Sequence, residues 1–172
     1  MPRLIRWRDG QAVWAEDPFT DVDDDQPVPQ GDVIVSLARF QREGRTLLGE
    51  GRNLGVRLAA DEAPESLIID LARLAVVCLA FPKFRDGRAY SAARVLRERM
   101  AYTGELRAVG DVVLDLAVPV LRCGFDTVVP ADSSSPDQWT AAARRFRHVY
   151  QRSADGREPA FAQRAKGEMS EA

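Results

Sequence analysis

The regular alternation of short apolar runs with helical segments constrains this chain more than any other feature. Five such runs are VIVSL, LGVRLA, AVVCLAF, ELRAV and DTVVP. A run that is apolar at nearly every position is typical of a strand buried on both faces, and a helix between successive strands gives those strands the same direction. The pattern therefore predicts an α/β fold with a mostly parallel sheet and right-handed crossovers.

The segments between these runs have the apolar spacing of three and four residues that is typical of amphipathic helices. Pro64 opens one of them at its first turn, where a missing N–H costs nothing. The residues expected on its inward face are Leu67, Ile68, Leu71, Leu74 and Ala75. Asp111 stands where it would cap the helix that follows ELRAV.

Five alternating units fit either an open doubly wound sheet or part of a β/α barrel. A closed barrel needs eight strands, so we expect the open doubly wound sheet and keep the partial barrel as the alternative. Before these units, LIRW and QAVWA flank Asp9-Gly10, a typical hairpin turn. The sequence thus predicts an N-terminal β-hairpin joined to the α/β fold.

The 172 residues fit one domain with additional segments at its ends. Residues 1–30 are predicted to form the hairpin and an acidic linker, and residues 31–150 the α/β domain. From residue 151 to residue 172 the composition is polar and without periodicity, which predicts a disordered tail.

Charge and hydropathy exclude several classes of partner. The formal net charge of −2 provides no general attraction to nucleic acid or to acidic lipid. No apolar run is long enough to cross a bilayer, and the start MPRLIRWRDG does not lead into the apolar stretch of a signal peptide. We expect a cytoplasmic protein that binds neither nucleic acid nor membrane.

The residue types used in metal and redox sites are scarce. Cys78, Cys123 and His148 do not have the spacing of metal ligands, so no metal site is expected. Both cysteines are expected to be reduced and non-catalytic, Cys78 because it lies within an apolar strand and Cys123 because it lies near a helix C-terminus. The cluster GEGRNLG precedes a strand and lacks the spacing of a dinucleotide-binding fingerprint.

The charged loop after AVVCLAF is the best candidate site, because ligands of parallel α/β folds collect at the carboxyl ends of strands. It places three cations beside a helix N-terminus, where an anion is favoured, and two hydroxyl groups follow. The residues predicted to bind an anion are Lys83, Arg85, Asp86, Arg88, Tyr90, Ser91 and Asp111. The alternative for this loop is a solvated turn shaped by Asp86-Gly87.

The run FPKFRDGRAYSAARVLRERMAYTGELRAVGDVVLDLAVPVLRCGFDTVV, together with VIVSLARF and LGVRL, resembles a bacterial family called domain of unknown function 934. The resemblance covers most of residues 1–150. It implies a place in assimilatory sulfate reduction, because family genes frequently lie beside those for sulfite or nitrite reductase. Members are often labelled as oxidoreductases without a demonstrated reaction. Of the family pattern Arg-Asp-Gln this chain keeps Asp115, but its polar neighbours are replaced by Leu114 and Leu116, which disfavours a catalytic role for this segment.

Three functions remain open, and the sequence identifies neither catalytic residues nor a cofactor. The first is an accessory protein of sulfite reduction that binds a small anion or a phosphate-bearing ligand, with sulfite reductase or another sulfur-assimilation enzyme as its partner. The second is an oxidoreductase with a bound flavin or nicotinamide. The third is a partner-binding module that uses the hairpin and the acidic linker.

Overall fold

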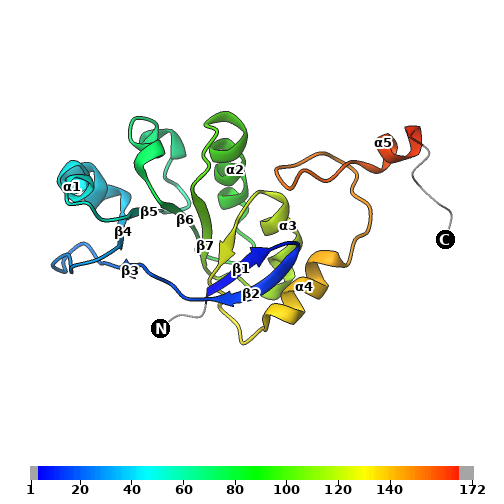
Figure 1. Cartoon of the computed structure of the whole chain (residues 1–172), viewed down its shortest axis with the longest axis horizontal. Helices are drawn as coiled ribbons and strands as arrows, with labels where there is room; N and C mark the ends of the chain where they lie inside the picture. Colours follow the sequence, from blue (N-terminus) through cyan, green and yellow to red (C-terminus); the bar gives the residue numbers. More distant parts are fainter. Residues whose placement is uncertain (1–3, 167–172) are drawn as a thin grey trace.

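The computed structural model describes residues 4–166, and its centre is one eight-stranded sheet (Figure 1). Across the sheet the strand order is β2-β1-β8-β7-β6-β5-β4-β3. The strands are β1 (Leu4–Arg8), β2 (Gln11–Ala15), β3 (Thr20–Asp21), β4 (Val33–Ser36), β5 (Leu54–Leu58), β6 (Val76–Phe81), β7 (Glu105–Gly110) and β8 (Thr127–Val128). Strands β3 to β8 are parallel, whereas β1 runs antiparallel to β2 and to β8.

Helical segments connect the parallel strands. The α-helices are α1 (Leu37–Gly49), α2 (Arg88–Arg94), α3 (Ala117–Arg122), α4 (Pro136–Arg144) and α5 (Ala160–Ala165). Ser36 begins α1 by accepting a hydrogen bond from the Arg39 backbone N–H, as an N-cap does. Ser135 and Gln138 form a capping box at the start of α4. No described helix is long and apolar enough to cross a membrane.

The predicted α/β class, the mostly parallel sheet and the N-terminal hairpin are confirmed. Of the two arrangements considered, the structure has the barrel-like one, and the preference for a doubly wound sheet is wrong. A doubly wound sheet reverses its strand order at one point and has helices on both faces. Here β3 to β8 follow one another without a reversal, and Figure 1 shows α1 and α2 on the same side of the strands.

The sheet curls into a half-barrel, and the short link between β2 and β3 explains why. These strands are the two edges of the sheet, yet only residues 16–19 join them. Five extended peptide steps span at most about 17 Å. In a flat sheet, seven strand spacings of about 4.8 Å would separate the edges by about 34 Å. The edges must therefore approach each other, and the link crosses the concave face that the helices leave uncovered.

The main hydrophobic core lies between the sheet and its helices. Strand residues such as Val56, Leu106 and Ala108 meet Leu96 of the α2 segment and Trp139 of α4 there. A smaller apolar cluster lies on the concave face, where Phe19 of the link packs against buried residues. Those residues are Ile34, Val76 and Cys78. Both faces of the central strands are thus covered, which explains their nearly continuous apolar sequence.

The segment opened by Pro64 differs from its prediction. It forms two 3₁₀ turns, Pro64–Leu67 and Leu71–Arg73, rather than one amphipathic α-helix. Leu67, Leu71 and Leu74 are buried as expected, but Ile68 is exposed. The interruption between the turns changes the rotation per residue, so an α-helical spacing misplaces this side chain.

The chain ends complete the described fold. Helix α4 covers the outer edge of the hairpin, where Thr140 Oγ1 accepts a hydrogen bond from the Ala12 N–H at 2.9 Å. Beyond α4, an isolated bridge joins Val149 to Pro159. The division into segments 1–30, 31–150 and 151–172 stays a prediction, and residues 167–172 of the expected tail lie outside the described residues.

Candidate functional site

The β6–α2 loop lies at the carboxyl edge of the sheet and is tied to the end of β7. The Asp111 N–H donates to the Phe81 carbonyl at 2.7 Å, and Asp111 Oδ2 accepts from the Phe84 N–H at 2.8 Å. Asp111 does not cap a helix, because α3 begins six residues later at Ala117. Its carboxylate instead fixes the predicted loop against the neighbouring strand.

Asp86 occupies the position at the start of α2 where the sequence predicts an anion. Its carboxylate accepts hydrogen bonds from the Arg88 backbone N–H at 3.2 Å, from Arg88 Nε at 3.0 Å and from Arg88 Nη2 at 2.6 Å. These hydrogen bonds lower the pKa of Asp86 to about 2. The chain therefore supplies its own anion here, and it neutralises Arg88.

Lys83 and Arg85 are the two cations of the loop that keep their charge uncompensated. Both are exposed, and neither side chain has a hydrogen bond or an ion pair with another described residue. The Arg85 guanidinium lies 5.3 Å from the centre of the Phe84 ring, a cation–π contact on a half-exposed aromatic face. The loop thus presents two unpaired cations beside the Asp86–Arg88 pair.

The two hydroxyl groups of the predicted site are elsewhere. The Tyr90 ring packs edge-on against Phe81, with 5.2 Å between ring centres, and its buried hydroxyl has no hydrogen-bond partner among the described residues. Burial raises the pKa of Tyr90 to about 12. Ser91 is exposed on α2. The structure therefore brings Lys83, Arg85, Asp86, Arg88 and Asp111 into one loop region but turns Tyr90 into the core.

The loop after β8 is held by its own polar network. Asp132 accepts hydrogen bonds from the Leu114 N–H at 3.0 Å and from the Ser134 N–H at 3.1 Å. Burial opposes ionisation, but these hydrogen bonds and that of the Ser134 hydroxyl prevail and lower the pKa of Asp132. The Ser134 hydroxyl accepts from Trp139 Nε1 at 2.7 Å. Each of these groups is satisfied within the network, which positions the loop.

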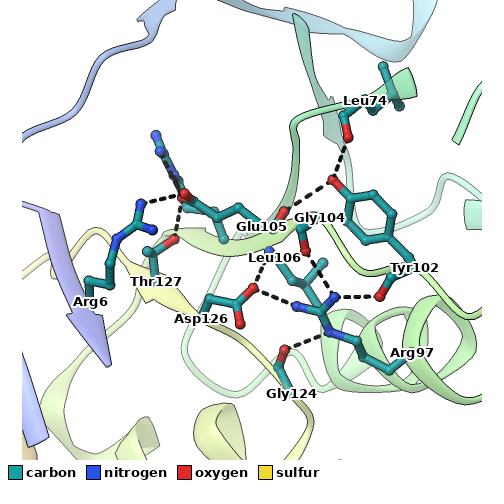
Figure 2. A network of polar contacts seen from close by, with 11 residues as sticks. Arg6, Leu74, Arg97, Tyr102, Gly104, Glu105, Leu106, Gly124, Asp126 and Thr127 are labelled. Carbon is teal, nitrogen blue, oxygen red and sulfur yellow. Dashed lines mark hydrogen bonds and ion pairs between the residues drawn. The ribbon is translucent and has the colours of Figure 1, made fainter. Parts of the chain in front are cut away.

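A buried ionic network on the concave face was not foreseen from the sequence. The Arg107 side chain is only 2% exposed, and it contacts Asp17 Oδ2 through Nη1 at 2.7 Å and Glu105 Oε1 through Nε at 2.9 Å. Glu105 also accepts from Arg6 at 2.5 Å and from the Thr127 hydroxyl at 2.7 Å (Figure 2). The positive charges of the two arginines balance the negative charges of the two carboxylates. Through these contacts the network joins β1, β7, β8 and the crossing link.

Arg97 organises the amino-terminal end of the strands, which lies opposite to the β6–α2 loop and next to Glu105 (Figure 2). Arg97 lies in a π-helical turn, Val95–Arg99, that extends α2. It donates to the carbonyls of Tyr102, Gly104 and Gly124 and to the carboxylate of Asp126. In β/α barrels this end serves stability rather than ligand binding, and Arg97 fits that role.

Neither cysteine has the environment of a reactive thiol. Burial raises the pKa of Cys78 to about 12, although the charge of Arg107 opposes the rise. Burial also raises the pKa of Cys123, against the opposing charges of Arg94 and Arg122. Both thiols are free. Among the described residues, no group of three or more His, Cys, Asp or Glu side chains could hold a metal ion.

These pKa shifts predict slow thiol chemistry in the folded protein, because the thiolate is the reactive form. At pH 7.5, an aromatic disulfide reagent should modify Cys78 only after unfolding and Cys123 far more slowly than it modifies glutathione. Both should react at once in 6 M guanidinium chloride. The single variants Cys78→Ala and Cys123→Ala show which thiol gives rise to each kinetic phase of the modification. A fast phase in the folded parent protein that is lost in Cys123→Ala would contradict the prediction.

The family assignment rests on a direct match. The family model described as a bacterial protein of unknown function (DUF934) matches residues 55–161, from β5 into α5. This is more than half of the chain. The chain belongs to the DUF934 family. The matched region includes the β6–α2 loop, Glu105, Arg107 and Arg97, and it begins after the hairpin and β4. DUF934 membership confirms the resemblance and names no reaction. Comparison with curated proteins gives no match.

Proposed function

We propose that this DUF934 protein is an accessory protein of assimilatory sulfite reduction, and that its β6–α2 loop binds a small oxyanion or a phosphate-bearing ligand. The observation that supports the anion site most directly is the pair of uncompensated cations, Lys83 and Arg85. They lie in a loop that Asp111 fixes at the carboxyl edge of the sheet. Other described arginines also lack a partner, but Lys83 and Arg85 lie at the carboxyl edge of the sheet, where parallel α/β folds bind their ligands. Two unpaired cations held close in sequence favour an anion between them.

The Asp86–Arg88 pair gives the site a competing internal anion. Arg88 is more than half exposed, so this pair is solvated and can exchange partners. An incoming oxyanion with two or more charged oxygens would engage Lys83 and Arg85 and share Arg88 with Asp86. The pathway part of the proposal is supported by the family resemblance, whose implied gene neighbourhood is that of sulfite reductase.

The proposal predicts saturable stabilisation by sulfate or phosphate. A ligand present at ten times its dissociation constant raises the free energy of unfolding by about 1.4 kcal/mol. For a chain of this size that corresponds to a rise in Tm of roughly 3–6 °C. The measurement is thermal unfolding with increasing sulfate or phosphate, at an ionic strength held constant with sodium chloride.

The double variant Lys83→Ala/Arg85→Ala should lose the saturable shift. The matched control is Arg145→Ala/Arg147→Ala, which also removes two exposed cations whose side chains have no described partner. This control should keep the shift. If the parent protein shows no saturable response, or if the response survives in Lys83→Ala/Arg85→Ala, the loop is a solvated turn and not an anion site.

The pathway is tested separately in the host bacterium. Deleting the gene should slow growth on sulfate and leave growth on cysteine unchanged. An oxidoreductase with a bound flavin is the alternative, and the absorption spectrum of freshly purified protein distinguishes it. The half-barrel order of the strands lacks the reversal at which doubly wound sheets bind dinucleotides. This topology favours the accessory role over a nicotinamide enzyme of that type.

A further inference from the structure

Two adjacent isoleucines stand exposed between the 3₁₀ turns that follow β5. Ile68 is 66% exposed and Ile69 is 87% exposed, although their neighbours Leu67 and Leu71 are buried. We call residues 68–69 the isoleucine ridge. Single exposed apolar residues are ordinary, but adjacent large ones that form a contiguous apolar patch are typical of an interaction site.

A groove lies on each side of the isoleucine ridge. The first, of about 350 Å³, separates it from α1 and has a mostly polar lining that includes Arg42 and Arg45, with Phe40 and Ile69 as its apolar residues. The second, of about 480 Å³, separates it from the end of the π-helical turn. Its lining includes Ile68, Leu71, Arg99, Met100 and Tyr102. The ridge and its grooves form a continuous surface with apolar side chains in the middle.

The charges at the rim of this surface are predominantly positive and unpaired. The side chains of Arg42, Arg45 and Arg99 have no hydrogen bond or ion pair with another described residue. The nearby carboxylate of Asp70 lies 3.3 Å from Arg73 and is thereby compensated. Asp70 is the one carboxylate among the described residues that line the two grooves, so the unpaired charges of this lining are those of the three arginines.

We infer that the isoleucine ridge and its two grooves are a docking surface for an acidic protein segment with large apolar side chains. Apolar side chains of that segment contact the ridge and fill the groove beside the π-helical turn, and its carboxylates face the three arginines at the rim. Apolar contacts of this kind supply affinity, while opposite charges at a rim increase the association rate and select the partner. The surface lies at the amino-terminal end of the strands, away from the β6–α2 loop, so it leaves the proposed anion site accessible.

A synthetic probe tests this chemistry directly. A fluorescent amphipathic peptide of about 16 residues carries leucines on one helical face and glutamates elsewhere, and its matched control carries lysines in place of glutamates. Fluorescence anisotropy with the full chain should show binding of the glutamate peptide and at least tenfold weaker binding of the lysine peptide. Raising sodium chloride to about 0.5 M should weaken the glutamate complex, because exposed charges are screened.

Three variants locate the binding. Ile68→Ser/Ile69→Ser and Arg42→Ala/Arg45→Ala should each weaken binding of the glutamate peptide at least tenfold. Tyr150→Ser/Phe161→Ser, which removes two exposed aromatic side chains away from the ridge, should bind as the parent does. All these side chains are exposed, so unchanged circular dichroism and unfolding curves are expected. Equal binding of both peptides, no binding of the glutamate peptide, or full binding by Ile68→Ser/Ile69→Ser would overturn the inference.

The partner that occupies the docking surface in the cell is identified with a photo-cross-linking amino acid at position 69. The same amino acid at position 150 is the control. The expected product joins position 69 to a net-acidic segment of a different protein, identified by mass spectrometry. A product that contains only two copies of this chain would show self-association instead. A product with lipid, or with a net-basic segment, would equally overturn the proposed partner chemistry.

Discussion

Arg107→Ala should lower the free energy of unfolding by about 3–5 kcal/mol, because removing one partner of a buried ion pair leaves its counter-charge buried without compensation. In this chain Asp17 loses the one ion-pair partner that it has among the described residues, while Glu105 keeps Arg6. The loss also releases the link that crosses the concave face, since Asp17 lies on that link. Equilibrium unfolding in urea measures the change.

Arg57→Ala is the matched control. Arg57 and Arg107 are each register partners of Cys78, so all three residues lie in one row on the concave face. Arg57 pairs with Asp21, which is more than half exposed, and such pairs contribute at most about 1 kcal/mol. Equal losses in the two variants would mean that burial of the Arg107 network is not what stabilises the fold.

The same network predicts a loss of stability in acid. Burial by itself would raise the pKa of Glu105, but the hydrogen bond from Thr127 and the charges of Arg107 and Arg6 prevail and lower it. A carboxyl whose pKa is lower in the folded state than in the unfolded state binds fewer protons when folded. Its contribution is therefore present above the unfolded pKa and is lost as the pH falls through the folded pKa. Arg107→Ala should reduce this acid dependence.

The strands and the hairpin were predictable because their signals are local. AVVCLAF and VIVSL are apolar at successive positions, and β6 and β4 are indeed covered on both faces. ELRAV, by contrast, alternates. Leu106 and Ala108 face the main core, while Glu105 and Arg107 face the link. That alternation was a usable signal for a polar row on the second face of β7.

The strand order and the curl of the sheet were not predictable from periodicity. Each strand–helix unit has the same local pattern in a doubly wound sheet and in a half-barrel. The deciding constraint is the length of the link between β2 and β3, and it becomes informative only once these strands are known to be opposite edges. Long-range pairing of this kind, such as Asp17 with Arg107, leaves no local mark in the sequence.

For the candidate site, the sequence placed the charged residues in the loop that follows β6 but did not resolve their partners. Parallel strands end at one edge, so Asp111 and the Lys83–Arg88 loop were expected together, and the structure places them so. The Asp86–Arg88 pair arises from the turn geometry at the start of α2. Spacing alone could not separate that paired arginine from the unpaired Lys83 and Arg85.

Gly110→Ala should be the most damaging small substitution at the carboxyl edge of the sheet. Gly110 has a φ of +95°, a region that residues with a Cβ rarely adopt. A Cβ at this position would also lie 2.4 Å from the Phe81 carbonyl oxygen, which is backbone and cannot rotate away. Backbone strain and overpacking each cost about 1–3 kcal/mol, so we expect a loss of about 4 kcal/mol in urea unfolding.

Gly51→Ala separates the two causes. Gly51 has a φ of +73°, but a Cβ there would have no atom within 4 Å, so its variant carries the strain without the collision. A loss of about 1–2 kcal/mol is expected for it. The Phe81 carbonyl that Gly110→Ala displaces also accepts the Asp111 N–H, and Asp111 in turn holds Phe84. The Gly110→Ala variant should therefore also lose the sulfate response of the β6–α2 loop, whereas Gly51→Ala should keep it. Similar losses of stability in both variants would show that the end of β7 can move away from Phe81, and would remove the argument that Asp111 fixes the loop.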